Sequence, residues 1–227
     1  MSITARHEGL FEGTENYTFH ILGCGAIGSS AALQLARMGA AYFHLYDRDK
    51  VEDVNIGVSQ YMQQDLGNAK VDALKGHLLG VNPEVIVDVH DGDFGVFYFQ
   101  DHNDIVILGF DSMSARMEAM VTICSNPTTR PKCVIDGRMG AEHYQQYILP
   151  KPTLDQYVKV WYSDELGDEE PCNAKATSYC SNMSGSFIAN SVRKFITDSP
   201  LNGNFSFHFP TMMLEMLGCF LCYRVEI

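Results

Sequence analysis

The sequence predicts an α/β fold, with a mostly parallel sheet, helices on both faces, and antiparallel strands added toward the C-terminus. Three observations support this prediction. Strand-like apolar runs alternate with helical patterns between residues 17 and 138. The run 104–110 is apolar almost throughout, as in a parallel strand that is covered on both faces. A glycine-rich turn, residues 23–28, directly follows the first apolar run.

Length and composition indicate one domain. The 227 residues, 46% of them hydrophobic, suffice for a full core. We expect an N-terminal arm over residues 1–16, a core over 17–138, and a C-terminal extension over 139–227 that contains a crossover loop. The net charge of −12 argues against nucleic acid as a partner.

We expect a cytoplasmic protein. The sequence begins without the apolar core of a signal peptide, and no apolar run approaches the ~20 residues that a membrane span needs. The seven cysteines are an odd number, which favours reduced thiols over a disulfide framework.

The glycine-rich turn follows the apolar run 17–22 and leads into an Ala-rich helical pattern. In such a turn Gly23 allows the tight bend, Gly25 lets the backbone approach a phosphate, and Gly28 lets the helix pack on the strand. The first amides of the helix can bind an anion. We therefore expect residues 17–138 to form a Rossmann-like, nucleotide-binding core.

A second predicted strand, residues 41–46, ends in Asp47-Arg48-Asp49. Asp47 lies 19 residues after Gly28, where a carboxylate at the end of the second strand accepts hydrogen bonds from ribose hydroxyls. Because strand, glycines and spacing agree, we favour ribose binding over a solvated acidic turn.

Two further charged residues stand at the start of predicted helices. The polar segment 50–60 is a candidate functional loop, and residues 65–70 open a helix that runs through Leu79. Lys70 lies in the first turn, where a cation opposes the helix dipole but suits a phosphate. Asp111 follows the strand 104–110, at the edge where open α/β sheets bind ligands. It could cap the next helix, or it could bind Mg²⁺.

The C-terminal extension gives weaker signals. We predict strands over 133–135, 144–149 and 158–162, and a helix over 184–196. The Met-rich segment 212–217 is typical of core or dimer packing. The acidic segment 164–170 is either a crossover loop or a solvated turn.

Together these residues resemble the ThiF/MoeB and ubiquitin-activating adenylyltransferase family. The similarity covers residues 18–138, in order and at compatible spacing. It rests on the glycine turn, Asp47-Arg48-Asp49-Lys50-Val51-Glu52, Asn55, Gln60, Gly67, Lys70, Asn82-Pro83, Asp111-Ser112 and Arg116.

The resemblance implies a homodimer that binds ATP and Mg²⁺ and adenylates the C-terminal carboxylate of a small ubiquitin-like or sulfur-carrier protein ending in Gly-Gly. By this resemblance Lys70 contacts the phosphates and Asp111 holds Mg²⁺. Asn55 and Gln60 position the phosphates or the incoming carboxylate. The nucleotide site as a whole would comprise Gly23, Gly25, Ala26, Ile27, Gly28, Asp47, Asp49, Asn55, Gln60 and Lys70.

The chain departs from the family pattern in its arginines. Family members commonly have Arg-Gln where this chain has Ser59-Gln60. Arg48 and Arg138 are the candidates to replace the missing arginine. Arg6 resembles an N-terminal family arginine that reaches ATP in the neighbouring subunit, whereas composition alone favours a loosely held terminal arm.

The cysteines point to a second departure. Cys172 lies where some relatives carry a thioester- or persulfide-forming cysteine, and Cys180 competes for that role. Relatives with a zinc site carry two Cys-x-x-Cys pairs, whereas here only Cys219 and Cys222 have that spacing. We therefore expect no zinc.

Two other functions use the same motifs. An NAD-dependent oxidoreductase would use the glycines and Asp47, but it leaves Lys70 and Asp111 without a task. A non-catalytic nucleotide-binding partner of an activating enzyme would explain the missing arginine, but it has less need of both charged residues. We expect an ATP-dependent adenylyltransferase.

Overall fold

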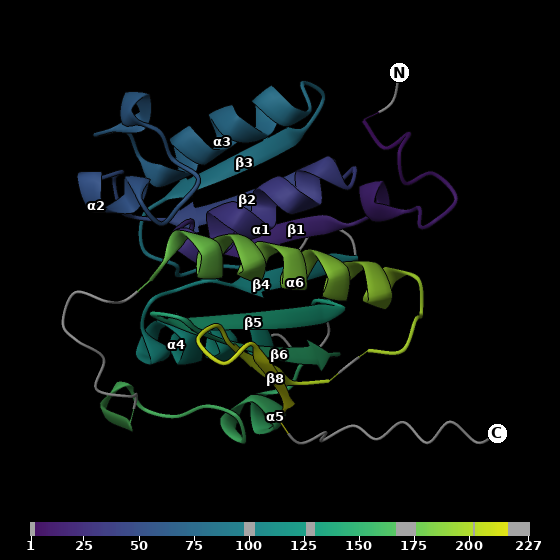
Figure 1. Cartoon of the computed structure of the whole chain (residues 1–227), viewed down its shortest axis with the longest axis vertical. Coiled ribbons are helices and arrows are strands. Elements are labelled where there is room, and N and C mark those ends of the chain that lie inside the picture. Colours follow the sequence, from purple (N-terminus) through teal and green to yellow (C-terminus); the bar gives the residue numbers. More distant parts are fainter. Residues whose placement is uncertain (1–2, 98–102, 126–129, 167–175, 202, 218–227) are drawn as a thin grey trace.

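The computed structural model describes residues 3–97, 103–125, 130–166, 176–201 and 203–217 (Figure 1). They form one eight-stranded sheet of order β3-β2-β1-β4-β5-β6-β7-β8. The first five strands pair in parallel and the last three antiparallel. The strands are β1 (Thr18–Leu22), β2 (Tyr42–Asp47), β3 (Ile86–Asp91), β4 (Asp104–Leu108), β5 (Cys133–Gly140), β6 (His143–Pro150), β7 (Phe205–His208) and β8 (Met213–Met216).

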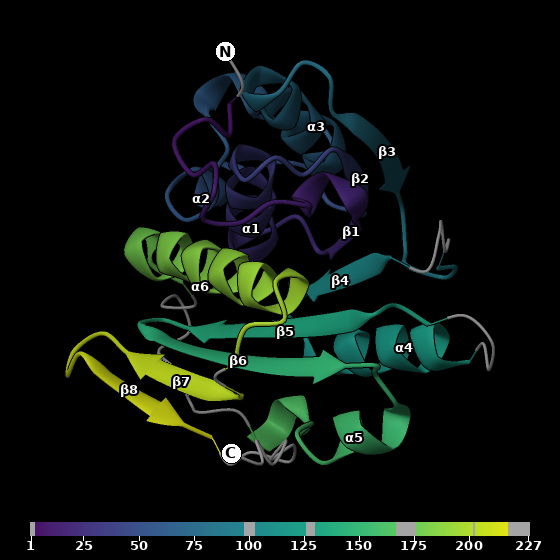
Figure 2. The same ribbon diagram turned by 90° about the vertical axis from the view of Figure 1, so that its right-hand side faces the viewer.

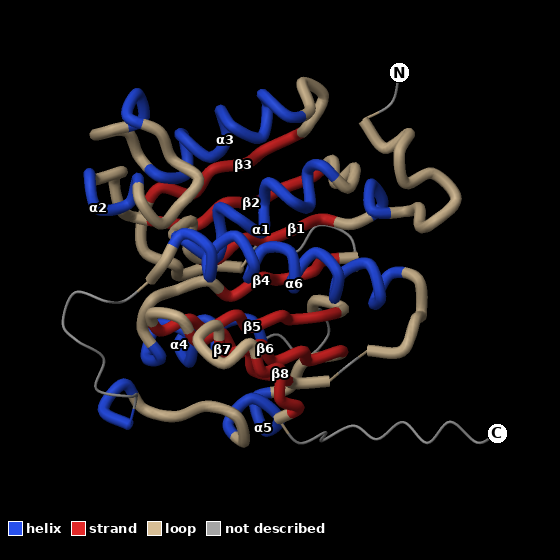
Figure 3. Tube along the Cα trace, viewed as in Figure 1, coloured by secondary structure: helices blue, strands red, loops and turns tan. Residues whose placement is uncertain are grey.

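Helices lie on both faces of the sheet. In Figures 1 and 3, α1, α3 and α6 lie in front of the strands, whereas α4 lies behind them. Figure 2 shows how the β7–β8 hairpin extends the sheet beyond β6. No helix in the described part of the chain is long and apolar enough to cross a membrane. The helices are α1 (Ala26–Arg37), α2 (Asp53–Ile56), α3 (Lys70–Val81), α4 (Met113–Cys124), α5 (Leu154–Val158) and α6 (Ser178–Ile196).

Each face of the sheet has its own apolar cluster. One cluster joins β1 and β2 to the first group of helices through side chains such as Ile21, Leu35 and Ile188. The other joins β4 to α4 and α5 through Met120 and Tyr157. This arrangement confirms the predicted α/β class, with parallel strands followed by antiparallel ones.

Several predicted elements differ from the observed ones. Residues 158–162 are not a strand: Thr153 caps α5 by accepting from the Gln156 amide, and the helix reaches Val158. The Trp161 amide then donates to the Tyr157 carbonyl, so that the chain continues in a turn after α5.

The late helix is longer than its apolar pattern predicts, because α6 begins at Ser178 with small polar residues. These small residues let α6 approach α1: a β-carbon at Gly185 would overlap Ser30. The Ser181 hydroxyl also donates to the Ala26 carbonyl, 2.9 Å away. The strands β7 and β8 are missing from the sequence prediction, and the side chains of β8 are exposed rather than packed in a core.

Three histidines line up across neighbouring parallel strands. His20 on β1 stacks on His44 on β2 with ring centroids 4.8 Å apart, and His44 lies 5.4 Å from His90 on β3. His20 Nε2 is 2.7 Å from the Asp104 carboxylate, and ring nitrogens of His44 and His90 are 3.1 Å apart. We call these three residues the histidine stack.

Burial keeps the histidine stack neutral. It lowers the pKa of His20 despite the opposing effect of Asp104. It also lowers the pKa of His44 to about 4, with the charge of His20 adding to the effect and Asp88 opposing it. The pKa of His90 is lowered chiefly by burial as well.

We predict that the free energy of unfolding decreases as the pH falls from 6.5 toward 4. The unfolded chain binds these protons first, because an unfolded histidine has a pKa of about 6.5. Stability is therefore fully present above that pH and is lost below it. Urea unfolding at pH 7.5, 6.5, 5.5 and 4.5 measures the slope.

The variant His44→Gln should flatten this slope. The control His208→Gln, at an exposed position, should leave it unchanged. An equal slope in the wild type and in His44→Gln would contradict the assignment to the histidine stack.

Candidate functional site

The glycine turn joins β1 to α1 with almost no space between backbone segments. Gly23 has φ +90°, and a β-carbon there would lie 2.8 Å from backbone atoms of Gly109. A β-carbon at Gly28 would overlap the Gly23 carbonyl. Gly25 differs, because a β-carbon there would meet nothing within 4 Å. The turn is thus closed toward the sheet and open at Gly25.

The N-terminus of α1 supplies amides at this opening. Gly25 is its N-cap, and no side chain caps the helix. The Ser29 amide, which donates to the Gly25 carbonyl, makes the first helical hydrogen bond. The amides of Ala26, Ile27 and Gly28 precede it, where a helix provides no internal acceptor. They are suited to bind an anion.

Asp47 connects the end of β2 to this turn. Its Oδ2 accepts from the Cys24 amide at 2.7 Å, and its Oδ1 accepts from the Asp49 amide at 2.9 Å. Burial raises the pKa of Asp47, although these two hydrogen bonds and the charge of Lys70 oppose the shift. Asp47, the residue predicted to bind the ribose, therefore lies beside the glycine turn, as its distance in sequence from Gly28 suggests.

Lys70 is a buried cation at the same place. Its side chain is 10% exposed, and Nζ lies 2.8 Å from Asp49 Oδ2. Burial by itself lowers the pKa of Lys70, but the hydrogen bond to Asp49 and the charges of Asp47 and Asp111 outweigh it, so that the pKa is raised. The ammonium group stays charged at neutral pH.

Asp111 is exposed, three residues beyond the end of β4. It does not cap α4: the Ser112 hydroxyl accepts from the Ala115 amide, and the Asp164 carboxylate accepts from the amides of Met113 and Ser114. Among the described residues none donates a hydrogen bond to Asp111. Of the two roles that the sequence leaves open, the structure excludes the cap.

The Asp111 carboxylate is suited to Mg²⁺. This ion is typically held by one or two carboxylates together with substrate phosphates. Asp111 is open to solvent and follows β4, which pairs in parallel with β1, so it lies at the same edge of the sheet as the glycine turn. Its charge also contributes to the raised pKa of Lys70. In the described parts of the chain, no cluster of three or more metal-ligating side chains forms a complete site. The phosphates would have to complete the coordination.

Tyr61 is a site residue that sequence reasoning missed. Its hydroxyl lies 2.6 Å from the Cys24 carbonyl oxygen and 3.2 Å from that of Lys70. It therefore joins the glycine turn to the start of α3, and it fixes Lys70 relative to the turn. The signal in the sequence was an aromatic residue directly after the polar segment 50–60.

The side chains of Asn55 and Gln60 make hydrogen bonds to other parts of the chain. Asn55 Oδ1 accepts from the Glu52 amide and so caps α2. The Gln60 amide donates to the Ser29 hydroxyl, and its side chain donates to Asn182 on α6. Both side chains therefore have partners within the chain.

The arginines occupy very different environments. Arg6 is exposed in the N-terminal arm, and its neighbour Thr4 contacts Gly39 beyond the C-terminal end of α1. Figure 1 shows this arm on the side of the molecule opposite α2. In its own subunit Arg6 is thus remote from the glycine turn. Arg48 is exposed and pairs with Asp93, Nη1 to Oδ1 2.8 Å.

Arg138 is buried and fully engaged. Its Nε and Nη2 donate to Asp136 Oδ2 at 2.9 and 2.7 Å, and its Nη1 donates to the Val160 carbonyl at 2.8 Å. Arg116 pairs with the other oxygen of Asp136. Removing one partner from such a buried pair is strongly destabilising. Arg138 therefore stabilises the fold by joining Asp136 to the segment that contains Val160.

Burial disfavours the thiolate form of the described cysteines. Burial raises the pKa of Cys24, Cys124 and Cys133, and Cys180 is completely buried. Cys172 and the pair Cys219 and Cys222 lie outside the described residues, so the expectations about a covalent thiol and about zinc stay predictions.

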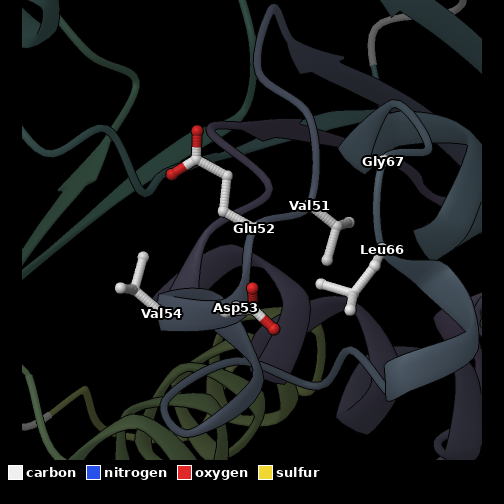
Figure 4. Close-up of a pocket in the computed structure, with 6 residues that line it drawn as sticks. All are labelled: Val51, Glu52, Asp53, Val54, Leu66 and Gly67. Atoms are coloured by element: carbon white, nitrogen blue, oxygen red, sulfur yellow. The ribbon is translucent and has the colours of Figure 1, made fainter.

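A hollow of about 470 Å³ lies next to α2, and none of the residues that line it belongs to the group around Asp47, Asp49 and Lys70. Figure 4 shows Val51 and Leu66 pointing toward one another there, with Asp53 nearby and the side chains of Glu52 and Val54 directed outward. The side chains that line it include two carboxylates and no cation, so they repel phosphate. The glycine turn, with Lys70, suits a nucleotide better.

Curated relatives with similar sequences include ubiquitin-like modifier-activating enzyme 5. The Caenorhabditis briggsae protein is 32% identical in an alignment of 121 residues that covers 47% of this chain and 28% of that protein. The Rattus norvegicus protein is 29% identical in an alignment of 130 residues that covers 51% of this chain and 32% of that protein. The match thus spans about a third of those relatives.

Solved structures share the fold. E. coli MccB with ATP superposes with a TM-score of 0.67 at 18% identity, over 90% of this chain and 64% of that one. PaaA gives a TM-score of 0.65 at 20% identity, over 89% and 64%. The model of the ThiF family matches residues 5–217. The described fold and this match over most of the sequence show that the chain belongs to the ThiF family.

Proposed function

We propose that this chain uses ATP to adenylate the C-terminal carboxylate of a small ubiquitin-like or sulfur-carrier protein. One observation carries the proposal: a buried, charged Lys70 stands beside Asp47, Asp49 and the glycine turn, with Asp111 close enough to act on it. A hydride-transferring enzyme that uses the same turn has no task for this lysine or for Asp111.

The proposed reaction needs charge and orientation rather than a protein nucleophile. A carboxylate oxygen of the carrier attacks the α-phosphorus, and the bond from this phosphorus to the bridging oxygen of pyrophosphate breaks. The products are an acyl-adenylate and pyrophosphate. Negative charge therefore develops on both sides of the α-phosphoryl group and must be offset there.

The residues divide this work. Lys70 exchanges Asp49 for the phosphates and stabilises the α-phosphoryl group. The amides of Ala26, Ile27 and Gly28 receive the phosphate oxygens, and Asp47 binds the ribose. Asn55 and Gln60 keep their proposed role only if their side chains leave the partners that they have here.

Asp111 would hold Mg²⁺, which would neutralise phosphate charge when it is bound. The carboxylate accepts no hydrogen bond from a described residue and so is available for that role. Its exposure lets it approach a nucleotide without breaking a contact of the fold.

The relatives support a carrier protein or peptide as the second substrate. The matched proteins are named as activating enzymes of a ubiquitin-like modifier, and MccB has been solved with ATP and with MccA. We propose that the chain works as a cytoplasmic homodimer built from one domain, with Arg6 completing the site of the neighbouring subunit. The crossover segment begins at Asp164, which is anchored on α4.

We predict that Lys70→Ala lowers ATP–pyrophosphate exchange on the order of 10²-fold, the usual effect of removing one charge-stabilising group from an active site. The measurement uses the full chain with Mg²⁺ and a Gly-Gly-ending carrier protein. Lys75→Ala, on the same helix α3, is the matched control and should retain exchange.

Exchange that survives Lys70→Ala would contradict the proposal. ATP binding without exchange in the wild type would instead favour a non-catalytic partner, and tight NAD binding an oxidoreductase.

We predict that Arg6 acts in trans. Arg6→Ala and Lys70→Ala subunits should each be inactive alone, but a mixture should regain roughly a quarter of the wild-type exchange, since half of the randomly mixed dimers are mixed and each contains one complete site. No recovery after mixing, in dimers shown to exchange subunits, would exclude the arm from the neighbouring site.

We predict that Cys172→Ser retains adenylation but loses transfer of the carrier to a thiol. Adenylation is measured by pyrophosphate exchange. Transfer is measured by a thiol-sensitive shift of the carrier on a gel. Cys124→Ser provides the control for removal of a partly buried thiol. Full transfer activity in Cys172→Ser would rule out a covalent role for this residue.

A further inference from the structure

The carboxylates beside the glycine turn outnumber the lysine that would bind phosphate there. Asp47, Asp49 and Asp111 contribute three carboxylates, and Lys70 is already paired with Asp49. A further cation from the chain would add to what Lys70 and a metal ion on Asp111 can offset when a nucleotide with several negative charges enters. Burial and existing partners decide which arginine can provide it.

Arg138 and Arg116 cannot leave their positions. Both are buried at 4% exposure, and both pair with Asp136, which is itself fully buried. Arg116 also donates to the carbonyl groups at the end of β4 and beyond it. Moving either guanidinium would leave a buried carboxylate without its partner, which is costly.

Arg48 has the opposite properties. It lies between Asp47 and Asp49 in the chain, and its side chain is 71% exposed. Its partner Asp93 is 81% exposed, so the ion pair contributes little to stability and is easily exchanged. Arg48 directly follows β2 and Asp111 follows β4, so both residues lie at the edge where these parallel strands end. Asp111 is also among the charges that raise the pKa of Arg48.

We propose that Arg48 leaves Asp93 on nucleotide binding and contacts the phosphates, and so supplies the second cation of the site. This proposal rests on the proposed function in one respect, that the ligand of the turn carries phosphates. Arg48 is a phosphate-binding residue in this proposal, and Asp93 is a competitor that holds it in the absence of nucleotide.

Because Asp93 and the phosphates compete for Arg48, substitutions of Arg48 and of Asp93 should change the ATP affinity in opposite directions. Arg48→Ala should weaken ATP binding about tenfold and leave adenosine binding unchanged, because adenosine carries no phosphate. Asp93→Asn should tighten ATP binding severalfold, because it releases Arg48. In the double variant the effect of Asp93→Asn should disappear, because there is no arginine left to release.

Titration calorimetry of the full chain with ATP and with adenosine, each with Mg²⁺, measures these affinities. Arg37→Ala removes the same charge from an exposed position in the last turn of α1 and should change the ATP affinity less than twofold. Unchanged adenosine binding also shows that each variant is folded.

Three results would overturn the proposal. In the first, neither Arg48→Ala nor Asp93→Asn changes the ATP affinity more than twofold. In the second, Arg48→Ala weakens the binding of ATP and of adenosine equally. In the third, Asp93→Asn still increases the ATP affinity when Arg48 is absent. Wild-type pyrophosphate exchange separates this proposal from the proposed function. Exchange without any dependence of ATP affinity on Arg48 refutes the role of Arg48 alone, whereas Arg48-dependent binding without exchange refutes the adenylation alone.

Discussion

The close approach of Gly28 to Gly23 brings the start of α1 onto the turn beside which Asp47 and Lys70 lie. Because neither residue has a side chain, α1 begins directly on the turn, and Gly23 in turn lies against Gly109 at the end of β4. The backbone therefore packs closely where β1 and β4 end and α1 begins. Asp47, which follows β2, is joined to this region because it accepts a hydrogen bond from the Cys24 amide. A side chain at Gly28 would displace α1 and separate these groups.

Two interactions then set the position of the cation. Tyr61 joins the carbonyl groups of Cys24 and Lys70, so that the start of α3 moves together with the turn. Asp49 pairs with the Lys70 ammonium, which keeps the buried charge compensated. In the proposed function a phosphate would replace Asp49 as the partner of Lys70, so that one anion is exchanged for another. The same principle distinguishes Arg48, whose partner is exposed, from Arg138, whose partner is buried.

The parallel core could be predicted from the sequence because its signals are local. The apolar run of β4, the spacing of Gly23, Gly25 and Gly28, and Asp47 after β2 each belong to a short stretch of chain. The predicted strand over 158–162 failed because its conformation depends on distant residues. The Val160 carbonyl accepts from Arg138, and the Trp161 indole donates to the Met113 carbonyl. A pattern of alternating residues contains no information about such partners.

The same limit applies to the charges. In the sequence, Arg48 and Arg138 each follow a predicted strand, one directly after Asp47 and the other two residues after Asp136, and the sequence around them does not show which of the two is buried. In the structure the two arginines differ because Arg138 pairs with the buried Asp136. The two carboxylate oxygens of Asp136 accept from Arg116 and Arg138, and the Tyr157 hydroxyl also lies 3.1 Å from Oδ2. Because a buried carboxylate needs such partners, Arg138 is committed to the fold before any ligand arrives. A charged residue can therefore be assigned to a site only after the partners of its neighbours are known, and by that criterion Arg48 is the arginine of the two that is available to a ligand.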